Sequence, residues 1–527
     1  MDDLKHKFID TFDLGNDREK QKAVFDVEGP TLIIAGPGTG KTYTLVLRTL
    51  YLILSGKAKP SEIILTTFTE KSAFELRDRL SLFARKLDEK INLHELLTGT
   101  IHSICDQFNI KFIKNTPLKK NYIVLDELTC SLFINEYFDL IIEPFNDGER
   151  FFGKWKGKWD TIGRIKGFFD KITEELIDPD ILIEKGDAFL IQIGEAYKIY
   201  RDLLIEHNRV DFSFQQRIFY DLLQDSGTRD KIASKIKYLL IDEYQDTNYI
   251  QEQIALSLVK PHNNLTVVGD EDQALYRFRG ATVRNILEFE THFEDCRRIK
   301  LLENYRSHKV IIEHYNAFIQ NIDWANPESL IQFRYPDKEV IPARSTISPD
   351  YPAVFCIWVD TLGQEAERFA DMVEYLLKNK IINDPSDVAL LMRSVMLEYS
   401  GPFIEALNRR NIKAFCPRAK AYFENEEIKV LIACFALIFN FVGEDLDDYS
   451  HKEIIYEGIK LIGRYASSPL GAYIRRMNEH IEGLIIGESL DEIPSDIPFQ
   501  LFAYSPFTEY LKDENASRNL SQFTALI

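Results

Sequence analysis

Residues 35–42 read Ala35-Gly36-Pro37-Gly38-Thr39-Gly40-Lys41-Thr42. The apolar run Thr31–Ile34 precedes this stretch and predicts a buried strand, and residues 43–47 after it predict a helix. Glycines let backbone N–H groups converge on a phosphate without Cβ clashes, and a helix N-terminus favours an anion. The order of strand, glycine-rich turn and helix therefore predicts a P-loop that binds a nucleoside triphosphate through all eight residues.

Two side chains at the end of this loop carry specific expectations. Lys41 is expected to reach the outer phosphates, and the hydroxyl of Thr42 is expected to hold Mg²⁺. Ala35 stands where the general pattern has glycine. An ordinary glycine-rich turn can show similar letters, so the loop alone leaves both interpretations open.

Bulk properties bound the class of protein. The chain has 527 residues, too many for one compact core, and 45% of them are hydrophobic, as in a globular protein. The net charge of −19 does not exclude a local basic groove, because salt screens charges beyond about 10 Å. The six cysteines are scattered singly, the N-terminus lacks an apolar signal segment, and no apolar run is long enough for a bilayer. We expect a cytoplasmic protein without a membrane partner.

Three further apolar runs end in polar residues, at 62–67, 238–242 and 265–270. Such runs are typical of parallel sheets that are covered by helices on both faces and present a ligand site at the carboxyl ends of their strands. Residues 113–211 differ, with helical patterning, aromatics and many lysines, and predict a helical domain inserted into the first α/β domain.

A second α/β block is expected after about Ser307. Residues 353–359 and 388–393 are candidate strands, and residues 365–379 between them have helical periodicity, so a βαβ unit is predicted. The region after Gly443 opens acidic and becomes helical again. The predicted fold class is α/β, with parallel sheets covered by helices and with helical insertions.

Two acid-rich stretches carry the chemistry. The strand at 239–241 ends in Asp242-Glu243-Tyr244-Gln245-Asp246, where the first acid can hold Mg²⁺ and the second can polarise a water. A solvated turn is the alternative, but it is disfavoured in a chain that also has the P-loop stretch. In residues 268–281, Gln273 is placed to sense the terminal phosphate. The rings of Tyr276 and Phe278 could pack in a core or stack on single-stranded bases.

These stretches, in their order along residues 20–429, resemble the motifs of the UvrD/Rep family of superfamily 1 DNA helicases. The resemblance implies two RecA-like P-loop NTPase lobes with helical inserted subdomains. Residues 1–112 and 211–307 would form the first motor lobe, and 113–210 its inserted helical domain. Residues 308–445 would begin the second lobe, and 446–527 its helical insertion. The stretches that carry the resemblance are 35–42, 67–73, 99–103, 242–247, 269–281, 304–307, 390–393 and 422–429.

The resemblance assigns residues to ATP and Mg²⁺. Lys41 and Thr42 would bind phosphates and metal, Asp242 would hold the metal, and Glu243 would act as the base. Gln273 would sense the γ-phosphate, and Arg306 would act as an arginine finger. Tyr305 would stack on adenine. Gln21 is a candidate adenine reader, because Lys20 occupies the position of the family's glutamine.

The resemblance also assigns a set of DNA contacts. The bases would meet the rings of Phe68, Tyr276 and Phe278, and the backbone would lie near Thr100, His102 and Arg393. For His102, an ordinary core histidine is the alternative.

The implied function is an ATP-dependent DNA helicase or translocase that moves 3′ to 5′ on single-stranded DNA and meets single/double-strand junctions. The alternative is an ATP- and DNA-binding module with weak or no turnover, which is either completed by a protein partner or is a truncated gene product. The family's last two motifs are absent after Lys429, so the chain is expected to stop inside the second insertion. The pathway, with DNA repair among the candidates, stays open.

Overall fold

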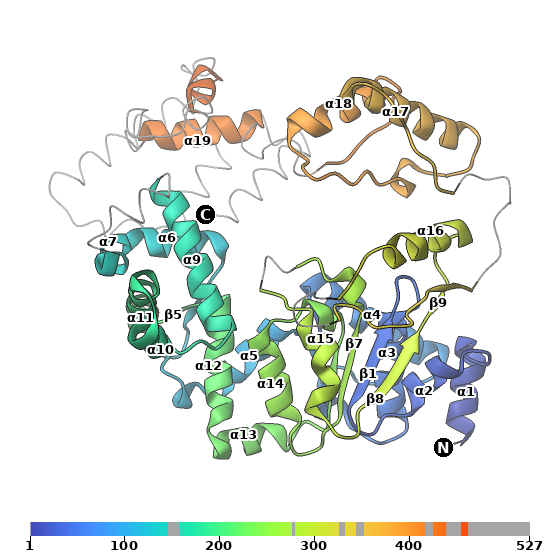
Figure 1. Cartoon of the computed structure of the whole chain (residues 1–527), viewed down its shortest axis with the longest axis horizontal. Coiled ribbons are helices and arrows are strands. Elements are labelled where there is room, and N and C mark those ends of the chain that lie inside the picture. Colours follow the sequence, from blue (N-terminus) through green and yellow to red (C-terminus); the bar gives the residue numbers. More distant parts are fainter. Residues whose placement is uncertain are drawn as a thin grey trace. The chain divides into compact units, whose positions relative to one another are not determined.

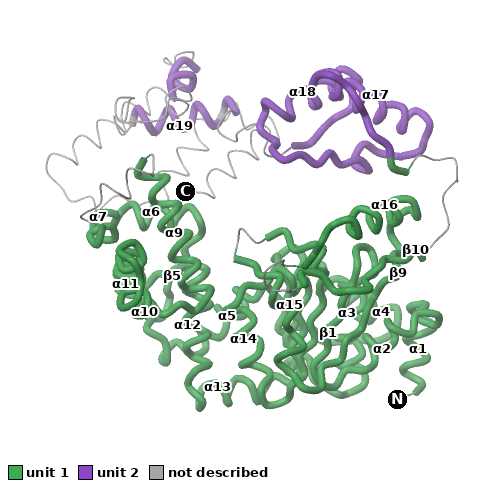
Figure 2. The backbone as a smooth tube through the Cα atoms, in the orientation of Figure 1, with its two compact units in different colours: residues 1–354 green, residues 355–527 purple. Residues whose placement is uncertain are grey.

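A computed structural model of the chain (Figure 1) describes residues 2–145, 157–276, 280–325, 332–343, 353–416, 425–438 and 455–461. Contacts divide the chain into two compact units, residues 1–354 and 355–527 (Figure 2). The described residues 308–325 and 332–343, which the sequence assigns to a second lobe, fall in the first unit.

A six-stranded sheet forms the centre of the first unit, in the order β3-β2-β6-β7-β1-β8. Every neighbouring pair is parallel, so the carboxyl ends of all six strands lie at one edge. The strands predicted near 31–34, 62–67, 238–242 and 265–270 are confirmed, and β3 and β8 extend the sheet on either side. Their bounds are β1 Thr31–Ala35, β2 Ile63–Thr67, β3 Leu97–Thr100, β6 Tyr238–Ile241, β7 Leu265–Gly269 and β8 Arg297–Leu301.

Alternate residues of the central strands β1 and β6 face two different cores, which is why these two strands are largely apolar. Ile33 and Leu240 pack with helices α1–α4, whereas Leu32 and Leu239 pack with α5, α12, α13, α14 and α15 (Figure 1). The α/β class predicted for this part is confirmed. The helices are α1 Asp2–Phe12, α2 Arg18–Phe25, α3 Lys41–Leu54, α4 Glu70–Lys86, α5 Ile101–Lys111, α12 Phe212–Gln224, α13 Ser226–Ala233, α14 Tyr249–Val259 and α15 Arg284–Glu288.

The segment between α5 and α12 is helical, as predicted, with its own core around Phe133, Ile165 and Tyr200. A short parallel pair, β4 (Ile123–Leu125) and β5 (Arg209–Asp211), joins its two ends. Its helices are α6 Glu127–Glu136, α7 Phe138–Ile141, α9 Lys158–Glu174, α10 Pro179–Lys185 and α11 Ala188–Glu206.

After β8 the chain stays on the first unit. It forms β9 (Glu303–Asn304), α16 (Lys309–Gln320) and β10 (Ile341–Pro342), and β10 pairs in parallel with β9. The buried amide of Asn316 in α16 binds both backbone groups of Val340, donating to its carbonyl at 2.8 Å and accepting from its N–H at 3.2 Å. Residues 334–342 are thereby fixed beside the sheet.

The regular elements in the described part of the second unit are helices. Helices α17 (Leu362–Lys378) and α18 (Leu397–Asn408) share a small core, and α19 (Glu426–Ile438) and residues 455–461 are further helices. The helix predicted at 365–379 is confirmed, but strands at 353–359 and 388–393 are not formed, so that prediction is wrong. Both segments lack a paired neighbour in the described chain, and a strand exists only through such pairing. Trp358 and Leu391 are accordingly 89% and 91% exposed.

Among the described residues, no helix combines the length and the apolarity that a membrane crossing needs.

Candidate nucleotide-binding site

The loop between β1 and α3 depends on two glycines in the left-handed region. Gly38 has φ +70° and Gly40 has φ +90°, and α3 begins directly after, at Lys41. A Cβ on Gly38 would lie 2.7 Å from the Asn304 Nδ2 atom, which itself donates to the Pro37 carbonyl at 2.7 Å. Only glycine fits such a position, so the loop and Asn304 fix each other.

Four of the five predicted catalytic residues, from three strand ends, meet beside this loop. Lys41 Nζ donates to Glu243 Oε2 at 3.1 Å and to Gln273 Oε1 at 3.3 Å. The Thr42 hydroxyl donates to Asp242 Oδ2 at 2.9 Å. Lys41 follows β1, Asp242 and Glu243 follow β6, and Gln273 follows β7. The P-loop residues and the predicted acids therefore share one site, and their individual roles stay predictions.

Burial shapes the electrostatics of this site. Desolvation, together with the charge of Glu243, raises the pKa of Asp242 to about 6. The same two causes raise the pKa of Asp246 to about 7. Glu243 has φ +52°, which is uncommon for a residue other than glycine and is a form of strain that clusters at functional sites. Asp242 and Asp246 are thus held where a negative charge on the carboxylate is unfavourable in the protein without a bound ligand.

Gln245 links the two acidic stretches, and its role was not predicted. Its Nε2 atom donates to Glu243 Oε2 at 2.8 Å, and its Oε1 accepts from the Asp270 N–H at 2.9 Å. Because Gln245 is 1% exposed, this link between the ends of β6 and β7 is rigid. Its place inside the acid-rich stretch was the available signal.

Tyr305, which is predicted to stack on adenine, lies at the other side of the loop. The Tyr305 N–H donates to the Gly38 carbonyl at 3.0 Å, and its hydroxyl donates to Asp17 and Glu303. Lys20 Nζ lies 4.0 Å from the Tyr305 ring centroid and 2.9 Å from Asp17 Oδ2. Neither Lys20 nor Asp17 was predicted to bind here, although Lys20 occupies the position of the family's adenine-reading glutamine.

Gln21 points elsewhere, because its amide donates to the carbonyls of Leu14 and Gly15. Its role as an adenine reader stays a prediction. Arg306 has an exposed side chain, and Arg393 is exposed in the second unit. Phe278 lies outside the described residues.

Four predicted DNA contacts lie among the described residues of the first unit. The rings of Phe68 and Tyr276 lie 4.8 Å apart between centroids. The Thr100 hydroxyl donates to Glu70 at 2.9 Å. Although part of the residue reaches the surface, burial of the His102 imidazole lowers its pKa to about 4, so the neutral ring accepts from the Gln216 amide at 3.0 Å. His102 is thus a satisfied, part-buried histidine, and its contact with DNA stays a prediction.

A cavity of about 960 Å³ opens between these residues and the inserted helical domain. Phe68 and His102 line one side and residues of α9 line the other. Lysines and carboxylates both face it, so it does not present a uniformly basic wall. Glu174 of α9 is part of this wall, where burial and the charge of Asp170 raise its pKa to about 7. The Ser213 hydroxyl donates to both acids, to Glu174 at 3.0 Å and to Asp170 at 3.1 Å.

Comparison with protein families matches both parts of the chain. Residues 16–294 match the UvrD/REP helicase N-terminal domain, and residues 299–488 match the UvrD-like helicase C-terminal domain. Similar proteins include the ATP-dependent DNA helicase SRS2 of Saccharomyces cerevisiae, 29% identical over 81% of this chain. Rep of Buchnera aphidicola is 28% identical over 80%, and PcrA of Leuconostoc citreum is 25% identical over 98%. The chain spans 36%, 59% and 65% of the length of these three relatives.

The loop geometry predicts a matched pair of glycine variants. Gly38→Ala forces a Cβ against the Asn304 amide, so we expect nucleotide affinity to fall at least about tenfold. Gly56→Ala is the control, because Gly56 has φ +73° but open space around its Cβ position. It should cost only about 1 kcal/mol of stability, with unchanged affinity. Titration with a fluorescent nucleotide measures the affinity of both variants. Equal losses of affinity in the two variants would contradict the role given to the contact between Gly38 and Asn304.

The raised pKa of Glu174 in the cavity wall predicts that the stability of the protein depends on pH. In the unfolded chain Glu174 ionises near its ordinary pKa of 4.5, whereas the folded protein keeps this proton up to about pH 7. Stability is therefore lost as the pH rises between these values and stays lower above them. Glu174→Gln should raise the free energy of unfolding by about 1–3 kcal/mol near pH 8 and by much less near pH 4.5.

The measurement is thermal unfolding of both proteins at the two pH values. Glu175→Gln, at the end of the same helix, is the control and should show neither effect. A stabilisation by Glu174→Gln that is equal at both pH values would rule out ionisation as its cause.

Proposed function

The chain belongs to the UvrD/Rep helicase family, and from that premise we propose that it is an ATP-dependent motor on single-stranded DNA. The observation that carries the proposal is the meeting of Lys41, Glu243 and Gln273 at the P-loop. A phosphate cradle, a carboxylate and an amide within one hydrogen-bonded group are the parts that nucleotide hydrolysis requires. The relatives named above are helicases by name, which supports DNA as the track.

Mg²⁺ fits the residues present. Thr42 and Asp242 offer a hydroxyl and a carboxylate oxygen 2.9 Å apart, and the carboxylate is buried beside a second acid. Hard divalent cations select such oxygen ligands, and Mg²⁺ needs only one or two from the protein. Thr42 and Asp242 would hold the ion. When bound, it would neutralise charge on the phosphates.

The protein's own residues then suggest an order of events. Lys41 is shared by Glu243 and Gln273 in the structure, so a terminal phosphate would compete with the Glu243 carboxylate for the same ammonium group. Releasing Glu243 from Lys41 leaves a carboxylate that can accept a proton from water, while Gln245 keeps it in place. Binding of the triphosphate would thereby prepare the base.

One loop would join hydrolysis to movement. Gln273 and Tyr276 are three residues apart, and the Tyr276 ring packs near Phe68 at the end of β2. A shift of Gln273 with the state of the nucleotide would move a ring that can stack on a base.

We propose 3′ to 5′ movement, single/double-strand junctions as substrates and action in the cytoplasm, following the sequence-based expectations.

Hydrolysis of ATP with and without single-stranded DNA tests the proposal. We expect strong stimulation by DNA in the wild type and a loss of at least about a hundredfold in Lys41→Ala. Glu243→Gln should bind ATP as the wild type does but turn it over at least about a hundredfold more slowly, because it lacks the base. Lys57→Ala is the control, since Lys57 pairs with Glu28 on the surface and should be dispensable.

Two outcomes would contradict the proposal. Nucleotide and DNA binding without stimulated turnover would favour a binding module that needs a partner. Wild-type turnover in Glu243→Gln would remove this residue from the mechanism.

A further inference from the structure

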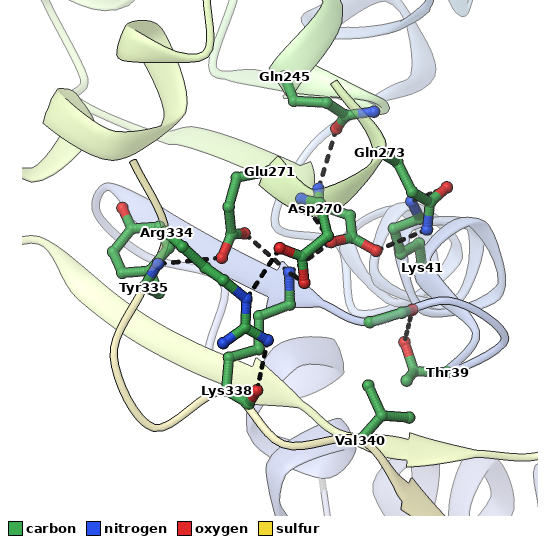
Figure 3. Close-up of polar contacts among 12 residues, drawn as sticks. Thr39, Lys41, Gln245, Asp270, Glu271, Gln273, Arg334, Tyr335, Lys338 and Val340 are labelled. Carbon is green, nitrogen blue, oxygen red and sulfur yellow. Dashed lines mark hydrogen bonds and ion pairs between the residues drawn. The ribbon is translucent and has the colours of Figure 1, made fainter. Parts of the chain in front are cut away.

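A buried lysine far from the P-loop in sequence is joined to it in space. Lys338 lies in residues 334–342, here called the strap, which run from Arg334 to β10. Its ammonium group is 0% exposed and contacts three consecutive acids (Figure 3). It bonds closely to Asp270, lies 2.9 Å from Glu271 Oε2, and lies 3.0 Å from Asp272 Oδ2.

Such a cluster is costly unless each charge is paired, and here other parts of the strap complete the pairing. Arg334 Nε donates to Asp272 Oδ1 at 2.9 Å, and the same guanidinium donates to the Lys338 carbonyl at 2.6 Å. The Tyr335 N–H donates to Glu271 Oε1 at 3.1 Å. The strap is therefore ionically attached to the loop that follows β7.

From this cluster a short chain of hydrogen bonds leads to the P-loop. Asp270 accepts from Lys338 on Oδ1 and from Gln273 Nε2 on Oδ2, the latter at 2.5 Å. The amide of Gln273 is thereby oriented with its oxygen toward Lys41, which donates to it at 3.3 Å. Lys41 can only donate and Asp270 accepts from the Gln273 Nε2 atom, so the two contacts together select this orientation of the amide.

The strap also meets the P-loop directly. A Cβ built on Gly36 would lie 2.7 Å from Val340 Cγ2, and Asn316 fixes the backbone of Val340. Two separate contacts, one ionic and one steric, therefore hold the strap against the residues that would surround the phosphates.

We propose that Lys338 is a positioning residue for the terminal phosphate. It fixes Asp270, and through Asp270 it holds the Gln273 amide with its oxygen toward Lys41. The inference rests on the proposed function in taking Gln273 as the residue that senses the γ-phosphate. It adds that the strap, a segment after α16, sets the preference of the site for a triphosphate over a diphosphate.

Nucleotide binding to the full chain tests this without requiring turnover. The preference is the ratio of the dissociation constant of ADP to that of a non-hydrolysable ATP analogue. Lys338→Met should lower this ratio at least about fivefold, while affinity for ADP stays within about twofold. Turnover should fall at least about tenfold, since a misplaced group acts mainly on the transition state. Lys300→Met is the matched control, because Lys300 donates to the strap at the Pro336 carbonyl but contacts none of the acids.

Folding of each variant is checked by its thermal transition. If Lys338→Met folds and keeps the wild-type ratio, or if the wild type itself shows no preference for the triphosphate, the inference is overturned. If Lys338→Met does not fold, Arg334→Met decides, because Arg334 lies nearer the surface and anchors the strap without touching Asp270. A ratio lowered in Arg334→Met supports the inference, and an unchanged ratio overturns it. Absence of DNA-stimulated hydrolysis in the wild type would instead refute the proposed function.

Discussion

Lys41 reaches Glu243 and Gln273 only because β1, β6 and β7 are parallel and end at the same edge of one sheet. Parallel pairing places the turn after every strand on that edge, so residues more than 200 positions apart become neighbours. The strands are apolar on both faces because helices cover both, and the polar chemistry is confined to the strand ends. Covering the sheet and assembling the site are consequences of the same arrangement.

Much of this arrangement could be predicted from local patterns. Continuous apolar runs that end in polar residues identified β1, β2, β6 and β7, and the glycine-rich turn identified the start of α3. β3 and β8 were missed for a physical reason: Leu97–Thr100 contains a glycine and two threonines, and Arg297–Leu301 alternates charged and apolar residues at the edge of the sheet. β8 is only partly buried, and β3 is mostly buried but interrupted by polar residues and a glycine, so both sequences carry a weaker strand signal.

The second unit shows where local patterns fail. Residues 353–359 and 388–393 have the composition of buried strands, yet they form no ladder in the described structure. Helix formation is a local event, and α17 was predicted correctly from its own periodicity. A strand is defined by a partner that may be anywhere in the chain, so composition fixes the tendency and not the pairing.

The same distinction between local and distant partners explains the polar residues that were missed. Lys20 meets Tyr305, and Lys338 meets Asp270, across sequence separations that no short motif spans. A lone lysine in sequence is most often a solvated cation, whereas a lysine with no exposed surface must be paired. Lys338 is stabilised only as a member of a cluster with three acids, and that cluster includes the residue that orients Gln273. The acids that follow β7 therefore do not form the site alone. Lys338, 67 residues beyond Glu271, neutralises part of their charge and fixes their geometry.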